Sequence, residues 1–353
     1  MGVSPTIEQA LQFHQQGRLS EAEPLYREAL RVSPRDYDLL HFFGVLKLQQ
    51  GDAAEAAGLI SKALELRPTA VDAMSNLSAA LLALNRHEEA LAHCARALTI
   101  QGDDVGALLN RGLALGHLGR AEEALASFDR VLAIKPDHVH AMYNRGTILV
   151  GLARYDEALA AYDRTLALAP SHVEALNNRG NLLARLGRNE EAVESYNRAL
   201  AIDPRHVTAL TNRSNALRKL GRYDEAMAGA ERALALAPDH VAALNNRGNL
   251  LLDLHRPEEA LAAFERAYTL QPSDANVLTN RAVALHALGR YEEALQGVEN
   301  ALATEPRLAN AHLTRGHILA KLDRHDEATE SYERARSLDP KSFSIDPTAG
   351  GGG

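Results

Sequence analysis

Apolar residues recur along the chain with the spacing of short amphipathic helices. In residues 173–186 they follow the 3.6-residue helical period, and Gly187 then interrupts the pattern. A second periodic segment covers residues 189–202 and ends before Pro204. The pattern therefore predicts two antiparallel helices joined by a tight turn.

This two-helix unit recurs with a period of 34 residues, which is the signature of a repeat architecture. A proline closes nine of the units, and Gly102 stands at the equivalent place in the third. The closing prolines are Pro34, Pro68, Pro136, Pro170, Pro204, Pro238, Pro272, Pro306 and Pro340. The predicted repeats are residues 1–34, 35–68, 69–102, 103–136, 137–170, 171–204, 205–238, 239–272, 273–306 and 307–340, and residues 341–353 form a tail or linker.

Small residues recur at the same period, at two places in each unit. An alanine preceded by glutamate is present in every second helix: Ala22, Ala56, Ala90, Ala124, Ala158, Ala192, Ala226, Ala260, Ala294 and Ala328. Twelve residues earlier, in the first helix, stand Gly44, Ser78, Gly112, Gly146, Gly180, Ser214, Gly248, Ala282 and Gly316. Only small side chains let two helix backbones approach closely, so we expect the hairpins to cross there. A single hairpin cannot bury its own apolar face, which predicts an all-α solenoid of ten stacked helix-turn-helix repeats.

Composition and charge narrow the class of protein further. The chain is 46% hydrophobic but only 5% aromatic, with no tryptophan, which fits closely packed helices. Its net charge of -8 does not favour binding to nucleic acid or to an anionic membrane. No apolar run approaches the roughly 18 residues of a membrane span, so we expect a cytoplasmic protein. The single cysteine, Cys94, is expected in the core.

The sequence offers no catalytic, metal or cofactor site. His138, His172, His206 and His240 repeat every 34 residues, so they fall on successive hairpins about 8–10 Å apart. Zinc requires ligand nitrogens at about 2.0–2.1 Å from one metal, so this row cannot form one site. No catalytic triad or phosphate-binding loop stands apart from the repeat. We therefore expect a non-enzymatic protein without a metal or cofactor.

These features resemble the tetratricopeptide repeat: a period of 34, a small residue in the first helix, a Glu-Ala pair, an aromatic such as Tyr196, and a closing proline. The opening hairpins also look like the repeat arms of bacterial O-GlcNAc-transferase-like proteins of the SPINDLY type. Lys47 departs from the pattern, because most repeats have a leucine there. The resemblance implies a right-handed superhelix whose first helices line its concave inner surface.

Asparagine recurs on the first helices although it is neither a good helix former nor a good core residue. It occupies the eighth position of seven repeats, and a second row stands three residues later. The candidate site residues are Asn76, Asn110, Asn144, Asn178, Asn212, Asn246 and Asn280, with Asn181, Asn215 and Asn249 in the second row. The resemblance implies that such asparagines bind the backbone of a peptide, and a carboxamide does carry the donors and the acceptor that complement a peptide group. The alternative is that each asparagine bonds to an adjacent hairpin.

An arginine ladder accompanies the asparagines: Arg111, Arg145, Arg179, Arg213, Arg247, Arg281 and Arg315. A row of cations could bind an acidic or phosphorylated partner. An acidic residue follows eighteen positions later in six of these repeats: Asp129, Asp163, Glu231, Glu265, Glu299 and Glu333. This coincidence favours a structural ladder in which each arginine pairs with the carboxylate of its own hairpin.

The leading functional hypothesis is a non-catalytic scaffold that binds a protein or an extended peptide in its concave groove through the asparagine ladder. One alternative is the substrate-recognition arm of an O-GlcNAc-transferase-like enzyme whose catalytic domain is absent from this chain. Another is homo-oligomeric assembly through the superhelix ends. Because no amphipathic helix follows Pro340, we also expect the apolar face of the last hairpin to be covered by Phe343 and Ile345, by a partner chain or by a missing downstream domain.

Overall fold

The computed structural model describes residues 5–340, which form twenty α-helices and no strand. The chain divides into two compact units, an N-terminal unit of residues 1–175 and a C-terminal unit of residues 176–353. The prediction of an all-α stack of two-helix repeats is confirmed for the described residues.

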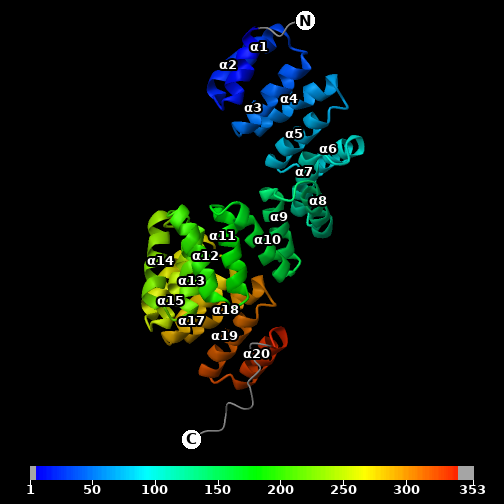
Figure 1. The fold of residues 1–353 in the computed structure, drawn as a ribbon. Helices are drawn as coiled ribbons and strands as arrows, with labels where there is room; N and C mark the ends of the chain where they lie inside the picture. The colour runs from blue at the N-terminus through cyan, green and yellow to red at the C-terminus, as the bar shows by residue number, and fades with distance from the viewer. Residues whose placement is uncertain (1–4, 341–353) are drawn as a thin grey trace. The chain divides into compact units, whose positions relative to one another are not determined.

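The N-terminal unit contains five hairpins that stack in chain order, as the blue to green ribbon of Figure 1 shows. Its first helices are α1 (Pro5–Gln15), α3 (Tyr37–Gln49), α5 (Val71–Ala83), α7 (Val105–His117) and α9 (Val139–Gly151). Its second helices are α2 (Leu19–Val32), α4 (Ala53–Leu66), α6 (His87–Ile100), α8 (Ala121–Ile134) and α10 (Tyr155–Leu168). Consecutive first helices pack side by side, most extensively α5 and α7.

The C-terminal unit repeats the arrangement with five more hairpins. Its first helices are α11 (Val173–Arg185), which begins at the end of the preceding unit, α13 (Val207–Lys219), α15 (Val241–Asp253), α17 (Ala275–Ala287) and α19 (Ala309–Lys321). Its second helices are α12 (Asn189–Ile202), α14 (Tyr223–Leu236), α16 (Pro257–Leu270), α18 (Tyr291–Thr304) and α20 (His325–Leu338). The predicted helix limits in residues 173–202 therefore agree to within one residue.

Each hairpin crosses where the small residues predict. All ten alanines of the second helices are buried, from Ala22 to Ala328. Five of the six ladder glycines on first helices face an aromatic ring, and Gly44 faces Ile60 instead. A Cβ added at Gly180, for example, would lie 2.6 Å from the ring of Tyr196, closer than real Cβ atoms approach. Where the first helix has Ser214 instead, the facing residue is the smaller Ala230, and the serine Oγ donates a hydrogen bond of 2.7 Å to the Ala226 carbonyl. The crossings thus combine side chains of complementary size.

The tight turn inside each hairpin requires a left-handed residue after the first helix. Glycine provides it in six repeats, for example Gly187 with φ of 78°. Ala153 adopts φ of 56° at the same place, a conformation that costs an L-residue roughly 1 kcal/mol. The break in the sequence pattern at Gly187 therefore marks the end of a first helix, and the equivalent positions mark it in the other repeats.

The outer surface of the last helix is polar, which corrects the expectation of an apolar end face. Thr329, Glu333 and Arg336 are exposed on α20, and no large apolar side chain of α19 or α20 is. Arg336 stands where the preceding repeat has Leu302. The expected cover, Phe343 and Ile345, lies outside the described residues.

Candidate peptide-binding groove

A groove of about 1020 Å³ crosses the first helices of the C-terminal unit, from α13 to α19. Asparagines from three helices face it: Asn245 and Asn249 from α15, Asn276 and Asn280 from α17, and Asn310 from α19. They occupy the fourth, seventh, eighth and eleventh positions of their repeats, which share one face of a helix. The repeat period thus gathers amide groups along one surface.

Apolar side chains lie between these amides. Val241, Leu252, Val277 and Val283 line the same groove. Val277 is buried and the other three are partly exposed, so the surface alternates hydrogen-bonding groups with small apolar areas. Such a surface matches a polypeptide, which presents backbone amides between side chains.

Five ladder asparagines are anchored to the preceding repeat. Asn246 Nδ2 donates to the carbonyl of Thr211 at 3.1 Å, and Asn280 Nδ2 donates to Asn245 Oδ1 at 2.9 Å. The remaining three bonds are Asn76 Nδ2 to His41 Nε2 (3.0 Å), Asn110 Nδ2 to the Ser75 carbonyl (2.9 Å) and Asn212 Nδ2 to Asn181 Oδ1 (2.8 Å). Each bond joins two adjacent first helices, so these asparagines have a structural role.

The anchored amides retain hydrogen-bonding capacity. Among the described residues, the Oδ1 atoms of Asn110, Asn246 and Asn280 accept no hydrogen bond, and each such oxygen has two lone pairs. Asn144 differs, because its Nδ2 donates to the carbonyl of His140 in the same helix at 2.7 Å. Asn178 accepts a bond of 3.4 Å from Asn177 Nδ2.

The second row of asparagines is less engaged. Asn181 Oδ1 accepts from the Tyr196 hydroxyl at 2.7 Å as well as from Asn212. Among the described residues, the side chains of Asn215 and Asn249 form no hydrogen bond, and the same holds for Asn276 and Asn310. Asn276 and Asn310 were missed as site residues. Their shared fourth position in successive repeats is the signal that could have identified them.

Charged groups at the groove are held by partners. Arg218 pairs with Asp253 at 2.7 Å, and Asp239 pairs with Arg266 at 2.9 Å. Asp274 Oδ1 accepts from the backbone N–H groups of Asn276 and Val277 and so caps α17. These carboxylates fix the edges of the groove and leave its centre to neutral amides.

Most members of the arginine ladder are held by partners, but the predicted pairing is wrong, and Arg247 forms no ion pair or hydrogen bond with a described residue. Arg145 pairs with Asp129 at 2.7 Å and Arg281 with Glu265 at 2.8 Å, each sixteen residues earlier on the second helix of the preceding repeat. The prediction placed each carboxylate eighteen residues later, in the same hairpin. Sequence spacing alone did not distinguish the two hairpins that flank each first helix. The ladder consequently bridges repeats.

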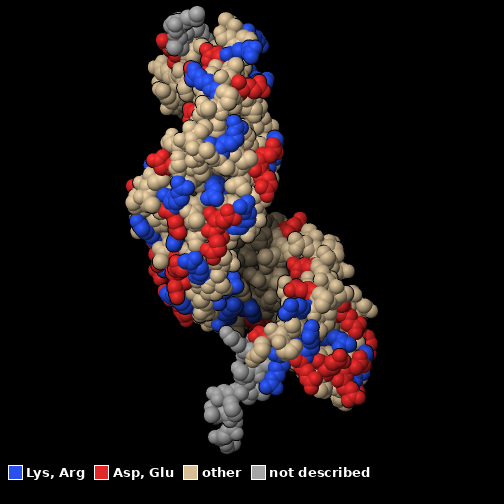
Figure 2. Space-filling model, turned by 90° about the vertical axis from the view of Figure 1, so that its right-hand side faces the viewer, with Lys and Arg blue, Asp and Glu red and all other residues tan. Residues whose placement is uncertain are grey.

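Two members of the arginine ladder show how it depends on its partners. Burial lowers the pKa of the Arg213 guanidinium, whose partner in the preceding repeat is the neutral carboxamide of Asn197 at 2.6 Å. Arg179 donates to the Ser195 hydroxyl of its own hairpin at 2.6 Å, as Arg111 does to Ser127 and Arg315 does to Ser331. Lys and Arg lie interspersed with Asp and Glu over most of the face shown in Figure 2, as paired ladders require.

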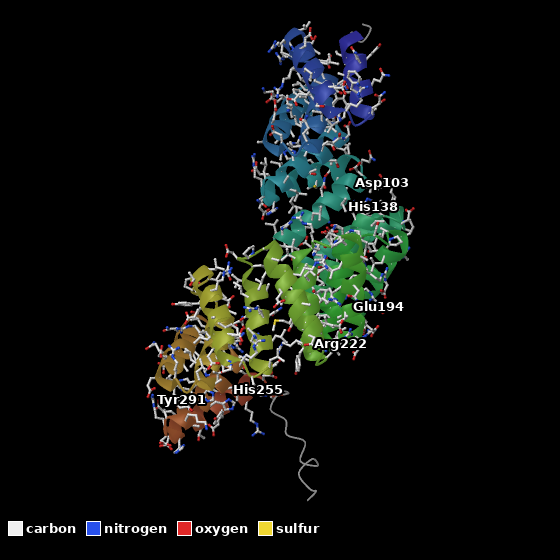
Figure 3. The ribbon with its side chains drawn as sticks, turned by 90° about the vertical axis from the view of Figure 1, so that its left-hand side faces the viewer. Asp103, His138, Glu194, Arg222, His255 and Tyr291 are labelled. Carbon is white, nitrogen blue, oxygen red and sulfur yellow. The ribbon has the colours of Figure 1, made fainter. Side chains whose placement is uncertain are left out.

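The histidine row caps helices. His138, labelled in Figure 3, precedes α9, and its Nδ1 accepts from the backbone N–H of Ala141 at 3.2 Å. His206 and His240 cap α13 and α15 in the same way. No group of three His, Cys, Asp or Glu side chains within residues 5–340 is placed to hold a metal ion. In the same range, no helix has both the length and the apolar character that a membrane span requires.

Stacked two-helix repeats with a polar groove along their first helices define a class of helical-repeat protein. Tetratricopeptide repeat models match residues 43–105, 143–207 and 245–305, and further models of the same description match residues 103–171, 205–273 and 309–342. The chain belongs to the tetratricopeptide repeat family. The narrower resemblance to O-GlcNAc-transferase-like repeat arms stays a prediction.

Two solved structures are similar to this chain, and the first of them shares its fold. A tetratricopeptide repeat protein from Parabacteroides merdae is 22% identical, with a TM-score of 0.54 over 70% of this chain and 98% of its own. YrrB, described as a TPR protein with an unusual peptide-binding site, is 23% identical, with a TM-score of 0.46 over 56% of this chain and 97% of its own. No curated protein sequence matches the chain.

Proposed function

We propose that this protein is an interaction scaffold that binds an extended polypeptide along the first helices of its C-terminal unit. The observation that carries the proposal is the set of unbonded amides, Asn249, Asn276 and Asn310, that line one groove. Each amide can donate to a carbonyl and accept from an N–H group of a peptide backbone. The Oδ1 of Asn280 adds an acceptor to the same surface.

Several such bonds are needed for useful affinity. A single hydrogen bond contributes roughly 0.5–1.5 kcal/mol net, so three amides contribute on the order of a few kcal/mol together. Adjacent first helices lie about 8–10 Å apart, and an extended chain advances about 3.3 Å per residue. Successive rungs would therefore meet every third residue of the ligand. The amides would recognise the backbone, and Val241 and Val283 would contact ligand side chains.

The test uses a peptide selected by display against the intact protein, measured by calorimetry. Replacing Asn249, Asn276 and Asn310 together by alanine should weaken its binding at least tenfold, or about 1.4 kcal/mol. N-methylation of the peptide backbone at every third residue should have a similar effect. Asn300→Ala, an exposed asparagine on α18 outside the groove, is the matched control and should leave affinity unchanged. Unchanged affinity of the triple variant, with helicity intact, would refute the proposal.

Assembly through the ends of the stack is less well supported. The outer surface of α20 exposes the polar residues Thr329, Glu333 and Arg336, and its large apolar side chains, Tyr332 and Leu338, are only partly exposed, which does not favour end-to-end packing. The groove is the better-supported candidate for partner binding.

A further inference from the structure

A recurring arginine contact ties successive second helices together. In several repeats the arginine at the twenty-eighth position donates to the carbonyl of the residue that closes the preceding repeat. The bonds are Arg96 to Pro68 (3.3 Å), Arg130 to Gly102, Arg164 to Pro136 (3.0 Å) and Arg232 to Pro204 (2.6 Å). Each bond bridges the space between one second helix and the next.

The second repeat lacks this contact, as the sixth, eighth, ninth and tenth repeats also do among the described residues. Lys62 stands at the position of the arginine and forms no hydrogen bond with Pro34 or any other described residue. A hollow of about 580 Å³, here called the α2–α4 pocket, opens between the two second helices at this place. Pro34 and Lys62 both line it. The pocket thus lies where the inter-repeat contact is missing.

The floor of the α2–α4 pocket is apolar. Leu40, Phe43 and Leu59 line it and are almost completely buried in the hairpins beneath. Gly58 forms part of the wall, and nothing lies within 4 Å of a Cβ placed there. The Arg27 guanidinium lies over the Phe43 ring, 5.2 Å from its centroid, so an inserted apolar side chain would meet the partly exposed Leu30 and the edge of Leu59.

The rim of the pocket is cationic. Arg31 and Lys62 line it, and neither forms an ion pair or a hydrogen bond with a described residue. Glu55 is the one carboxylate among the lining residues, and it is already held by Arg27 at 3.0 Å and by Lys47 at 3.3 Å. Arg31 and Lys62 can therefore bind carboxylates of a partner molecule, which would give the interface complementary charges.

We propose that the α2–α4 pocket is a docking site for an acidic segment of a partner protein. The segment would insert one aromatic or aliphatic side chain against Leu30 and Leu59 and would place flanking carboxylates on Arg31 and Lys62. This site lies on the second helices of the N-terminal unit and does not depend on the groove proposed above. The protein would therefore bind two different polypeptide segments. The asparagines of the groove would bind the backbone of one, and the α2–α4 pocket would bind an apolar side chain and the flanking carboxylates of the other.

The test is fluorescence anisotropy of the full chain with the fluorescein-labelled peptide Glu-Asp-Phe-Leu-Glu-Asp. Two matched peptides carry lysine in place of the acids or serine in place of Phe-Leu. We expect the acidic apolar peptide to bind at least tenfold more tightly than either. Arg31→Glu/Lys62→Glu should weaken its binding at least tenfold, whereas Arg205→Glu/Arg307→Glu, the same charge change on exposed residues of the C-terminal unit, should not.

Two further variants separate the pocket from general electrostatics. Gly58→Trp should fill the hollow and block binding without loss of helicity, and Lys62→Arg should reinstate the contact with the Pro34 carbonyl and reduce binding. The Asn249, Asn276 and Asn310 triple variant should bind the acidic peptide normally, which distinguishes this site from the groove. The proposal would be overturned if the wild-type chain did not bind the acidic peptide, if the lysine peptide bound equally well, or if the pocket variants had no effect. It would also be overturned if decanoate, a fatty-acid anion, displaced the peptide completely, because the pocket would then bind a lipid.

Discussion

The first helices of the two units present different chemistry at the same repeat positions. At the eleventh position, four of the five repeats of the N-terminal unit have an apolar residue and the fifth has Thr147, while three of the five repeats of the C-terminal unit have asparagine and the others have Val283 and His317. The backbone geometry is the same in both, so the difference lies in the side chains alone. One repeat fold thus supports an apolar surface in one unit and an amide-lined groove in the other.

The interiors of the two units also differ, because the buried lysine Lys47 lies in the N-terminal unit. Lys47 is 5% exposed, and its Nζ lies 2.6 Å from Glu23 and 3.3 Å from Glu55. The later repeats have leucine at the position of Lys47, from Leu81 to Leu319. At this position one inter-repeat interface therefore holds a buried charge where the later ones hold an apolar side chain.

The largest effect is expected from removing the buried cation. Lys47→Ala should destabilise the N-terminal unit by about 3–5 kcal/mol, because it empties an almost completely buried position and removes the shortest of the hydrogen bonds that Glu23 accepts. Thermal or urea unfolding followed by circular dichroism measures the change. Leu81→Ala, at the same repeat position, should cost about 2–5 kcal/mol through cavity formation alone.

The control is the double variant Glu23→Leu/Lys47→Leu, which gives this interface the apolar character of the other repeats. Replacing a buried ion pair with well-packed apolar side chains is often neutral or stabilising by 1–4 kcal/mol in roughly comparable cases. A double variant as unstable as Lys47→Ala would show that the ionic cluster fits a geometry that leucine cannot.

Acid should weaken the same interface. The hydrogen bond from Lys47 lowers the pKa of Glu23 to about 2 from its ordinary 4.5, with Gln50 and Arg27 contributing. A depressed carboxyl pKa contributes stability that is complete above about pH 4.5 and is lost as pH falls toward 2. The loss should be on the order of 2–3 kcal/mol. Hydrogen exchange of residues 19–66 measured between pH 5 and pH 2.5 should show it.

The acid effect has its own control. Glu23→Leu/Lys47→Leu should remove most of the pH dependence of exchange in residues 19–66. If both proteins lose protection equally over that range, other carboxylates determine the acid sensitivity of the N-terminal unit.

The repeated small residues predicted the fold because each helix crossing depends only on residues of its own hairpin. Each crossing needs small residues at two fixed positions, and Ala192 and Gly180 satisfy it in the way their spacing indicates. The pairing of Gly180 with the ring of Tyr196 could also have been read from the sequence, since the facing residue becomes Ala230 where Ser214 replaces the glycine. Size complementarity is visible within one chain whenever the unit repeats ten times.

The candidate site was less predictable, because a first helix contacts two hairpins. Spacing alone does not say whether Arg145 pairs with Asp163 of its own hairpin or with Asp129 of the preceding one, and the structure selects Asp129. The same ambiguity affects the asparagines. Their recurrence predicted hydrogen bonding, but only the three-dimensional arrangement separates Asn246, bonded to Thr211, from the unbonded Asn249.

That separation gives the smallest and most informative prediction, a comparison of two alanine substitutions three residues apart on α15. Asn246→Ala should destabilise the C-terminal unit by about 1 kcal/mol, because its Nδ2 bond to the Thr211 carbonyl joins two repeats. Asn249→Ala removes no internal bond and replaces a poor helix former with the best one, so stability should be unchanged or rise by about 0.5 kcal/mol. For binding of the display-selected peptide, we expect the opposite order. Asn249→Ala should lose more affinity than Asn246→Ala, because only Asn249→Ala removes an unbonded amide of the groove. Equal effects of the two substitutions on both stability and affinity would mean that the two rows share one role, and the distinction between an anchoring row and a ligand-binding row would fall.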